Sequence, residues 1–105
     1  MANRSAGIII NGATGRIGST QHIGNALVPI RAEGGLALPS VQVVPKLLFV
    51  GRDANKLAPL AERLEASWTT DLDAALSDPA YEILCDTAAT GDRPRVLRKA
   101  IAAGK

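Results

Sequence analysis

Short apolar runs alternate along this chain with longer segments in which apolar residues recur every three or four positions. The runs span residues 7–11, 46–50 and 81–86, and a shorter one is expected at 68–69. Continuously apolar runs are typical of strands buried on both faces of a parallel sheet, and the segments between them have the spacing of amphipathic helices. The pattern therefore predicts an α/β fold in which strands and helices alternate.

Two helices are predicted in the first two thirds of the chain. The first runs from Arg16 to about Ala32, and Pro29 is expected to kink or shorten it because proline lacks the N–H for the helical bond. The second follows Asp53, whose carboxylate suits a helix cap. Pro59 lies too deep for a first-turn proline, so this helix is expected to start late or irregularly.

Two shorter helices complete the alternation, over residues 70–77 with Thr70 as cap, and after Asp92 with Pro94 in the first turn. The last helix is expected to turn four apolar residues inward: Val96, Leu97, Ala100 and Ile101. Residues 36–45 contain two prolines and are expected to form a loop. A single domain over residues 1–105 follows, with about four parallel strands in the order 3-2-1-4 and helices on both faces.

Composition excludes several classes of protein. The 105 residues are 47% hydrophobic, which argues against disorder, and the net charge of +2 is scattered without a basic block, so a nucleic-acid partner is not indicated. Cys85 and His22 are the single residues of their types, which leaves no internal disulfide and no zinc cluster. No signal-peptide core or long apolar stretch is present. A cytoplasmic protein with no membrane partner and no metal is expected.

The segment "NGATGRIGS", residues 11–19, contains three glycines between the first strand and the first helix. Gly12 permits a tight turn, Gly15 lets a pyrophosphate approach the backbone, and Gly18 permits close packing of helix on strand. The N–H groups of the first helical turn then face the phosphate. This context predicts a Rossmann-type dinucleotide site, with a merely structural turn as the alternative.

Arg16 supports this interpretation, because a cation at a helix N-terminus opposes the helix dipole unless an anion lies nearby. The alternative is that its side chain reaches into water. Thr14 and Ile17 belong to the same expected contact surface.

The end of the second strand predicts which cofactor is bound. Gly51 occupies the position where an NAD site usually has an acid, and Arg52 follows. An arginine there accommodates the 2′-phosphate of NADP, so NADP is favoured over NAD. Asp53 is alternatively the ribose-binding acid, displaced by two residues. Lys56 adds a second positive charge or is a solvated helix residue.

The loop after the fourth strand, residues 86–91, is small and polar, as expected for a segment beneath the nicotinamide. Thr87 is the candidate contact, with an ordinary strand-to-helix connection as the alternative. His22 has no recognisable acidic or nucleophilic partner and is better interpreted as a helix residue. No catalytic residue is predicted.

Four segments together resemble the amino-terminal part of the glucose-fructose oxidoreductase/inositol dehydrogenase family. They are "IIINGATGRIG", "LLFVGRDANKLAPLAERL", "TTDLDAALSDPAYEILCDTAAT" and "RKAIAAGK". The resemblance implies cofactor contacts at Gly12, Gly15, Arg16, Gly18 and Arg52, and more weakly at Lys56 and Thr87. It implies a sugar-like or polyol-like substrate.

The resemblance has limits. The glycine spacing is one residue longer than the family's usual form and is similar to that of dihydrodipicolinate reductases and short-chain-type reductases. The family's Glu-Lys-Pro motif and its substrate domain would lie beyond Lys105. We therefore expect the NADP-binding portion of an oxidoreductase, truncated before a fifth strand.

Two other functions remain open: a fragment of a short-chain-type reductase or epimerase, and a nucleotide-binding module without catalysis. In each case, strand 81–86 is expected to leave an apolar edge that pairs with another copy of the chain or with a missing domain.

Overall fold

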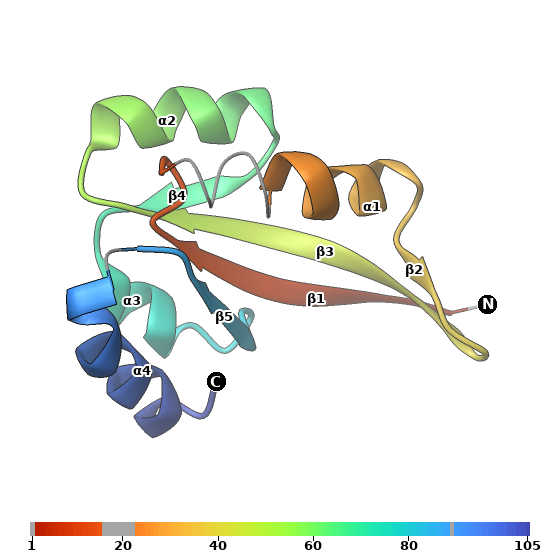
Figure 1. Ribbon diagram of the computed structural model, residues 1–105. Helices are drawn as coiled ribbons and strands as arrows, with labels where there is room; N and C mark the ends of the chain where they lie inside the picture. Colours follow the sequence, from red (N-terminus) through yellow and green to blue (C-terminus); the bar gives the residue numbers. More distant parts are fainter. Residues whose placement is uncertain (1, 16–22, 89) are drawn as a thin grey trace.

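The structure, a computed structural model, describes residues 2–15, 23–88 and 90–105. At its centre, β1 (Ala2–Asn11) lies between β3 (Val41–Val50) and β5 (Ile83–Asp86), and both pairings are parallel. β4 (Ser67–Thr69) extends the sheet as a parallel neighbour of β3 (Figure 1). The strand order is β2-β3-β1-β5, where β2 spans Leu36–Ala37, and β4 also pairs with β3. It differs slightly from the predicted order 3-2-1-4, because β2 adds a strand that the sequence does not predict.

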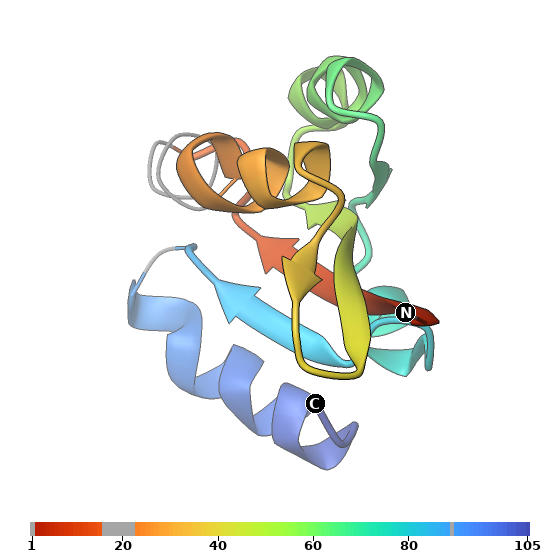
Figure 2. The same cartoon turned by 90° about the vertical axis from the view of Figure 1, so that its right-hand side faces the viewer.

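Helices cover both faces of this sheet (Figure 2). α1 (Val28–Ala32) and α2 (Ala54–Arg63) lie on one face, and α3 (Leu72–Ser77) and α4 (Arg93–Ala102) lie on the other. Alternate residues of each strand point to opposite faces, so Ile9 and Ile10 belong to two separate apolar clusters. The predicted α/β fold, a partial doubly wound sheet of the Rossmann type, is thereby confirmed.

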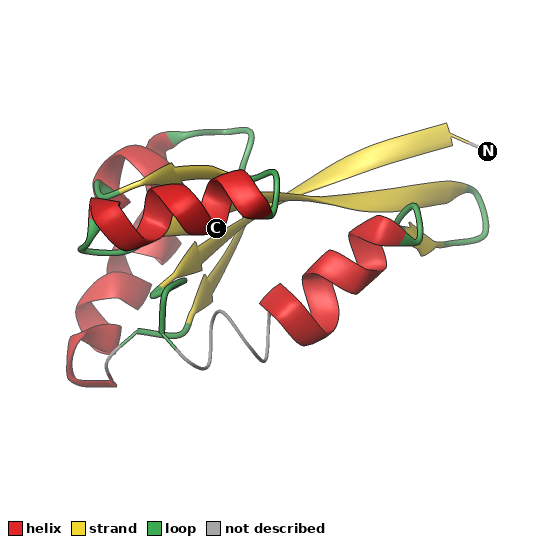
Figure 3. Cartoon of the chain, turned by 90° about the horizontal axis from the view of Figure 1, so that it is seen from above, coloured by secondary structure: helices red, strands yellow, loops and turns green. Residues whose placement is uncertain are grey.

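The two central strands are longer than the sequence predicts. Residues 2–6 carry no apolar run, yet they continue β1 because they pair in register with residues 41–45 of β3. Pairing between strands thus overrides local propensity here. The predicted loop over residues 36–45 is wrong in part, because β2 (Leu36–Ala37) returns as an antiparallel partner of β3. Figure 3 shows this amino-terminal ribbon extending past α2 and α4.

α2 corrects the expectation drawn from Pro59. The helix begins directly after Asp53, whose Oδ1 accepts a hydrogen bond from the N–H of Asn55 at 2.9 Å. Pro59 lies inside the helix on its exposed side. Asn55, whose carbonyl loses its helical donor to this proline, is exposed as well, so water can satisfy that group. The capping carboxylate therefore starts the helix where the proline alone would delay it.

Two further helix ends differ from the prediction. Asp71, not Thr70, caps α3, and its Oδ1 accepts from the N–H of Ala74 at 3.1 Å. In the predicted first helix, residues 16–22 lie outside the described residues, and residues 23–27 form a π-helical segment that leads into α1. Pro29 occupies the start of α1, at the change from one helical type to the other.

The last helix buries fewer side chains than predicted. Val96 and Ala100 are buried, whereas Leu97 is 43% and Ile101 is 74% exposed. Among the described strands, β5 is the edge strand on this side of the sheet. Only a narrow face of α4 can therefore pack against the sheet. Ile83 of β5 is exposed too. Pairing of this edge with another chain or domain remains a prediction.

Candidate functional site

A hollow of about 390 Å³ lies at the carboxyl end of β1 and β3. In doubly wound sheets, ligands bind outside the carboxyl ends of the strands. The residues that line the hollow follow β1, β3, β4 and β5: Asn11, Gly12, Thr14, Val50, Gly51, Arg52, Asp53, Lys56, Thr70, Leu72, Ala88, Asp92 and Arg95. The structure thus brings together Gly12, Thr14, Gly51, Arg52 and Lys56, which the sequence analysis proposes separately.

Gly12 makes the turn that the sequence predicts. Its φ is +79°, and a Cβ at this position would stand 2.8 Å from the backbone nitrogen of Ala88. Its N–H donates to the carbonyl of Val50 at 2.8 Å, and the N–H of Gly15 donates to the carbonyl of Gly12 at 3.0 Å. The loop after β1 therefore fits closely between the ends of β3 and β5, and only glycine fits at its first position.

Only part of the remaining glycine segment belongs to the described residues. Gly15 does and is exposed, whereas Arg16, Ile17 and Gly18 lie outside them. Their proposed contacts with a phosphate remain predictions.

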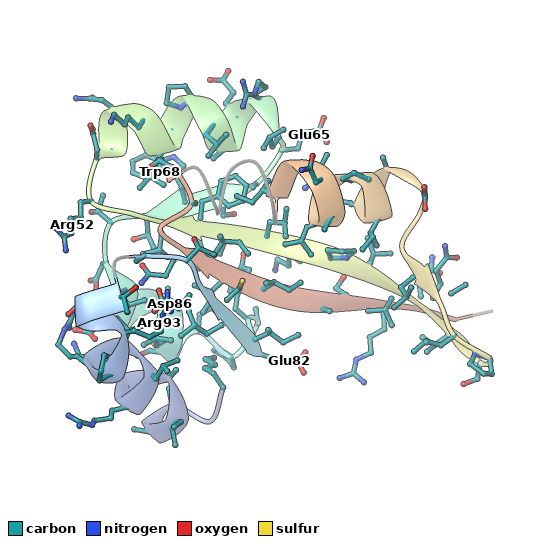
Figure 4. The ribbon with its side chains drawn as sticks, viewed as in Figure 1. Arg52, Glu65, Trp68, Glu82, Asp86 and Arg93 are labelled. Atoms are coloured by element: carbon teal, nitrogen blue, oxygen red, sulfur yellow. The ribbon has the colours of Figure 1, made fainter. Side chains whose placement is uncertain are left out.

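The segment after β3 supplies two of the cations around the hollow. Arg52 is exposed and points away from the ribbon at this end of the sheet (Figure 4), and the Lys56 side chain is exposed as well. Within the described part of the chain, neither side chain makes a hydrogen bond or ion pair. Asp53 also lines the hollow, but its carboxylate caps α2.

Thr87 does not line the hollow. Its Oγ1 donates to the carbonyl of Asn11 at 2.8 Å, and its N–H donates to the same carbonyl at 2.9 Å. The side chain thus fastens the loop after β5 to the end of β1. Its hydroxyl also lies 3.3 Å from the carbonyl oxygen of Gly12, so Thr87 contacts the glycine turn although it does not line the hollow. Its proposed contact with a cofactor remains a prediction.

Sequence reasoning misses a polar network behind the hollow. The Asp86 side chain is 4% exposed and accepts from Asn11 Nδ2 at 3.1 Å, from the N–H of Ala88 at 3.2 Å and from Arg93 Nε at 3.3 Å. Arg93 Nη2 also donates to the carbonyl of Ala88 at 3.2 Å. Figure 4 shows Asp86 and Arg93 facing each other between β5 and α4. The network holds Ala88, and with it one wall of the hollow.

One signal for this network is present in the sequence. Asn11 and Asp86 are polar residues that end two apolar runs, and the register of β1 and β5 makes them direct neighbours. Polar residues at the ends of adjacent parallel strands meet at one edge of the sheet.

Asp92 is not the cap that the sequence predicts for α4. Residues 90–92 form a 3₁₀ turn, which gives Asp92 φ −92° and ψ −9° rather than the extended backbone of a cap, and its side chain makes no capping bond. Its carboxylate instead accepts from Arg95 Nε at 2.8 Å and from Arg95 Nη2 at 2.7 Å.

The hydrogen bond from Arg95 lowers the pKa of Asp92 below its usual value, and the positive charges of Arg95, Arg52 and Lys99 act in the same direction. These interactions favour the ionised form of the Asp92 carboxyl. Arg95 therefore stands at the hollow as one half of an ion pair.

Two features are absent from the residues that the structure describes. No three or more His, Cys, Asp and Glu side chains gather there in a way that could hold a metal ion. None of the helices described is long and apolar enough to cross a membrane.

No model of a known protein family matches the sequence. The chain is similar to the D-xylose dehydrogenase of Paenarthrobacter nicotinovorans, with 41% identity over 102 residues, or 93% of this chain and 26% of the relative. A crystal structure from Desulfitobacterium hafniense, assigned as an NADPH-dependent oxidoreductase, matches 97% of this chain and 26% of its own with a TM-score of 0.65 and 14% identity. The second likeness concerns the fold alone. In both comparisons the chain spans about a quarter of the other protein's length.

Proposed function

We propose that this chain is the dinucleotide-binding portion of an oxidoreductase of the glucose-fructose oxidoreductase/inositol dehydrogenase family. The observation that carries the proposal is the meeting of a glycine turn with Arg52 and Lys56, which make no hydrogen bond or ion pair within the described residues, at the carboxyl end of a Rossmann-type sheet. The similarity to a D-xylose dehydrogenase supports the family and the class of reaction. When bound, the nicotinamide cofactor supplies or accepts the hydride.

The turn at Gly12 and Gly15 fits the role of a pyrophosphate site. Gly12 has no side chain to obstruct the hollow, and Thr14 lines it beside the turn. Residues 16–18, which the sequence assigns to the same phosphate site, lie outside the described residues.

NADP is the proposed cofactor because of the residues after β3. Arg52 has no partner among the described side chains that would neutralise it by direct contact, and Lys56 lies one helical turn further on. A guanidinium suits a phosphate monoester because its planar N–H groups can bind two oxygens at once. Asp53, the alternative ribose-binding acid, is engaged as the cap of α2, which supports NADP over NAD.

The proposed substrate is a sugar-like or polyol-like alcohol or carbonyl compound. This part of the proposal depends on the similarity to a D-xylose dehydrogenase, which the chain matches over about a quarter of that protein's length. We assign no catalytic acid or base among the residues of the hollow.

Calorimetric titration tests the proposal. NADPH and NADH are titrated into the chain and into Arg52→Ala, with Arg4→Ala as a control. Arg4 is an exposed arginine at the far end of β1, so its loss changes the net charge equally. Losing a charge-assisted contact should weaken NADPH binding by about 1.5–3 kcal/mol and leave NADH binding unchanged.

Two results would overturn parts of this account. If Arg52→Ala weakens both cofactors equally, or neither, Arg52 does not recognise the 2′-phosphate. If the unaltered chain binds neither NADPH nor NADH, the proposed function itself is wrong.

A further inference from the structure

Arg95 lines the hollow but belongs neither to the glycine turn nor to the segment after β3, and it has no role in the proposed function so far. It comes from α4, whereas Arg52 comes from the end of β3, yet both line the same hollow. Arg95 thus lies on a different element from every cofactor contact proposed above.

Asp92 connects the two arginines electrostatically. Its carboxylate makes two short hydrogen bonds to the Arg95 guanidinium, and the charge of Arg52 acts on it through space. The carboxylate therefore stands within the field of both guanidiniums. Its two oxygens occupy the fork of Arg95, which suits the oxygens of a phosphate equally well.

The Asp92–Arg95 pair is also easily opened. The two side chains are 36% and 55% exposed. Exposed pairs are screened by water and contribute little to stability, so a dianion of higher charge can replace the carboxylate at small cost. Separating Asp92 from Arg95 would also leave the start of α4 unchanged, because the Asp92 side chain makes no capping hydrogen bond.

We propose that Arg95 is a second recognition group for the 2′-phosphate of the dinucleotide, and that Asp92 is an internal counter-ion that holds Arg95 at the hollow until the phosphate replaces it. This inference rests on the proposed function. Arg52 and Arg95 then contact the phosphate from two elements. The negative charge of Asp92 stays near the bound phosphate and repels it. Asp92 therefore reduces the preference of the site for NADP over NAD.

The charges around the hollow support this assignment. Among the described residues, three cations line it, Arg52, Lys56 and Arg95, together with two carboxylates, Asp53 and Asp92. Neutralising Asp92 removes the carboxylate that competes for Arg95 and leaves the cap of α2 intact. The inference therefore predicts opposite effects for the two members of one ion pair.

Binding of two small probes tests the inference. Adenosine 2′,5′-bisphosphate and adenosine 5′-monophosphate are titrated into the chain and into Arg95→Ala, Asp92→Asn and Arg98→Ala. Arg98 is the matched control, because it is an exposed arginine on the same helix that does not line the hollow. Circular dichroism and thermal unfolding of each variant establish that it is folded.

Arg95→Ala should weaken the bisphosphate about tenfold and leave the monophosphate within about twofold, as expected for one charge-assisted contact. Asp92→Asn should strengthen the bisphosphate severalfold with little effect on the monophosphate. Arg98→Ala should change both by less than about twofold, through screened long-range attraction alone.

The outcomes separate the inference from the proposed function. If Arg95→Ala and Arg98→Ala behave alike, or if Asp92→Asn weakens the bisphosphate, Arg95 is not a recognition group. Preference for the bisphosphate that depends on Arg52 would still support the proposed function. If the unaltered chain binds neither probe nor NADPH, both proposals fail together.

Discussion

Two groups of polar residues meet at the carboxyl end of the sheet, and they use their hydrogen-bonding capacity in opposite ways. The network (Asn11, Asp86, Thr87 and Arg93) bonds to itself and to nearby backbone. The rim (Arg52, Lys56 and Arg95) lies around the hollow with exposed side chains. The network stabilises the shape of the hollow. In the rim, by contrast, Arg95 alone has a hydrogen-bond partner among the described residues, and that partner is the partly exposed Asp92 carboxylate.

The same division separates two aspartates at the starts of helices. Asp53 precedes α2, and its carboxylate accepts a hydrogen bond from the backbone of that helix. Asp92 precedes α4, and its carboxylate accepts hydrogen bonds from the Arg95 side chain instead. The backbone decides which occurs, because Asp53 is extended, with φ −112° and ψ 101°, whereas Asp92 is the last residue of a 3₁₀ turn, with φ −92° and ψ −9°. The residue type alone does not reveal which role an aspartate takes.

The largest effect on stability is expected at Gly12, whose turn packs against Thr87 of the network. Gly12→Ala places a Cβ 2.8 Å from backbone and requires a positive φ of a residue that rarely adopts one. We expect a loss of about 2–4 kcal/mol in the free energy of unfolding, measured with urea.

Gly91→Ala is the control for Gly12→Ala, because a Cβ at position 91 meets no atom within 4 Å. Its expected effect is within about 0.5 kcal/mol, as for other surface substitutions. Equal losses in the two variants would mean that the loop after β1 is not tightly held between its neighbours.

A smaller effect should distinguish the two aspartates. Asp53→Ala removes the cap of α2 and should lower the free energy of unfolding by about 1 kcal/mol. Asp92→Ala removes no cap and should leave that free energy nearly unchanged, since its partner Arg95 is free to reach water. If Asp92→Ala is as destabilising as Asp53→Ala, the ion pair is structural, and the comparison between the two helices is wrong.

Much of the fold could be predicted because the buried strands are continuous apolar runs. "KLLFV" contributes residues to both clusters, so its strand is recognisable without knowledge of its neighbours. Residues 2–6 are different, since their strand exists through pairing with β3 and no local pattern marks it. The exposure of Leu97 and Ile101 likewise depends on how much sheet lies beneath α4.

The candidate site divides in the same way. Gly12, Gly51 and Arg52 follow strands directly, and the edge at which parallel strands end could be predicted from alternation alone. Asp86, Arg93 and Arg95 act through partners on other elements, and their roles depend on register and on the turn before α4. The hydrogen bond from the Thr87 hydroxyl to the carbonyl of Asn11 likewise depends on a partner on another element, and the sequence does not indicate it.

The most direct test of the account is to map NADPH binding on the backbone amides of the isotopically labelled chain by nuclear magnetic resonance. We expect the amide signals of Gly12, Gly51, Arg52, Ala88 and Arg95 to shift on titration. The signals of Ser5, Lys46 and Ser67, which line another hollow beside the middle of β1 and β3 and the start of β4, should remain unchanged. Shifts confined to Ser5, Lys46 and Ser67, or no shifts at saturating NADPH, would show that the carboxyl end of the sheet does not bind the cofactor.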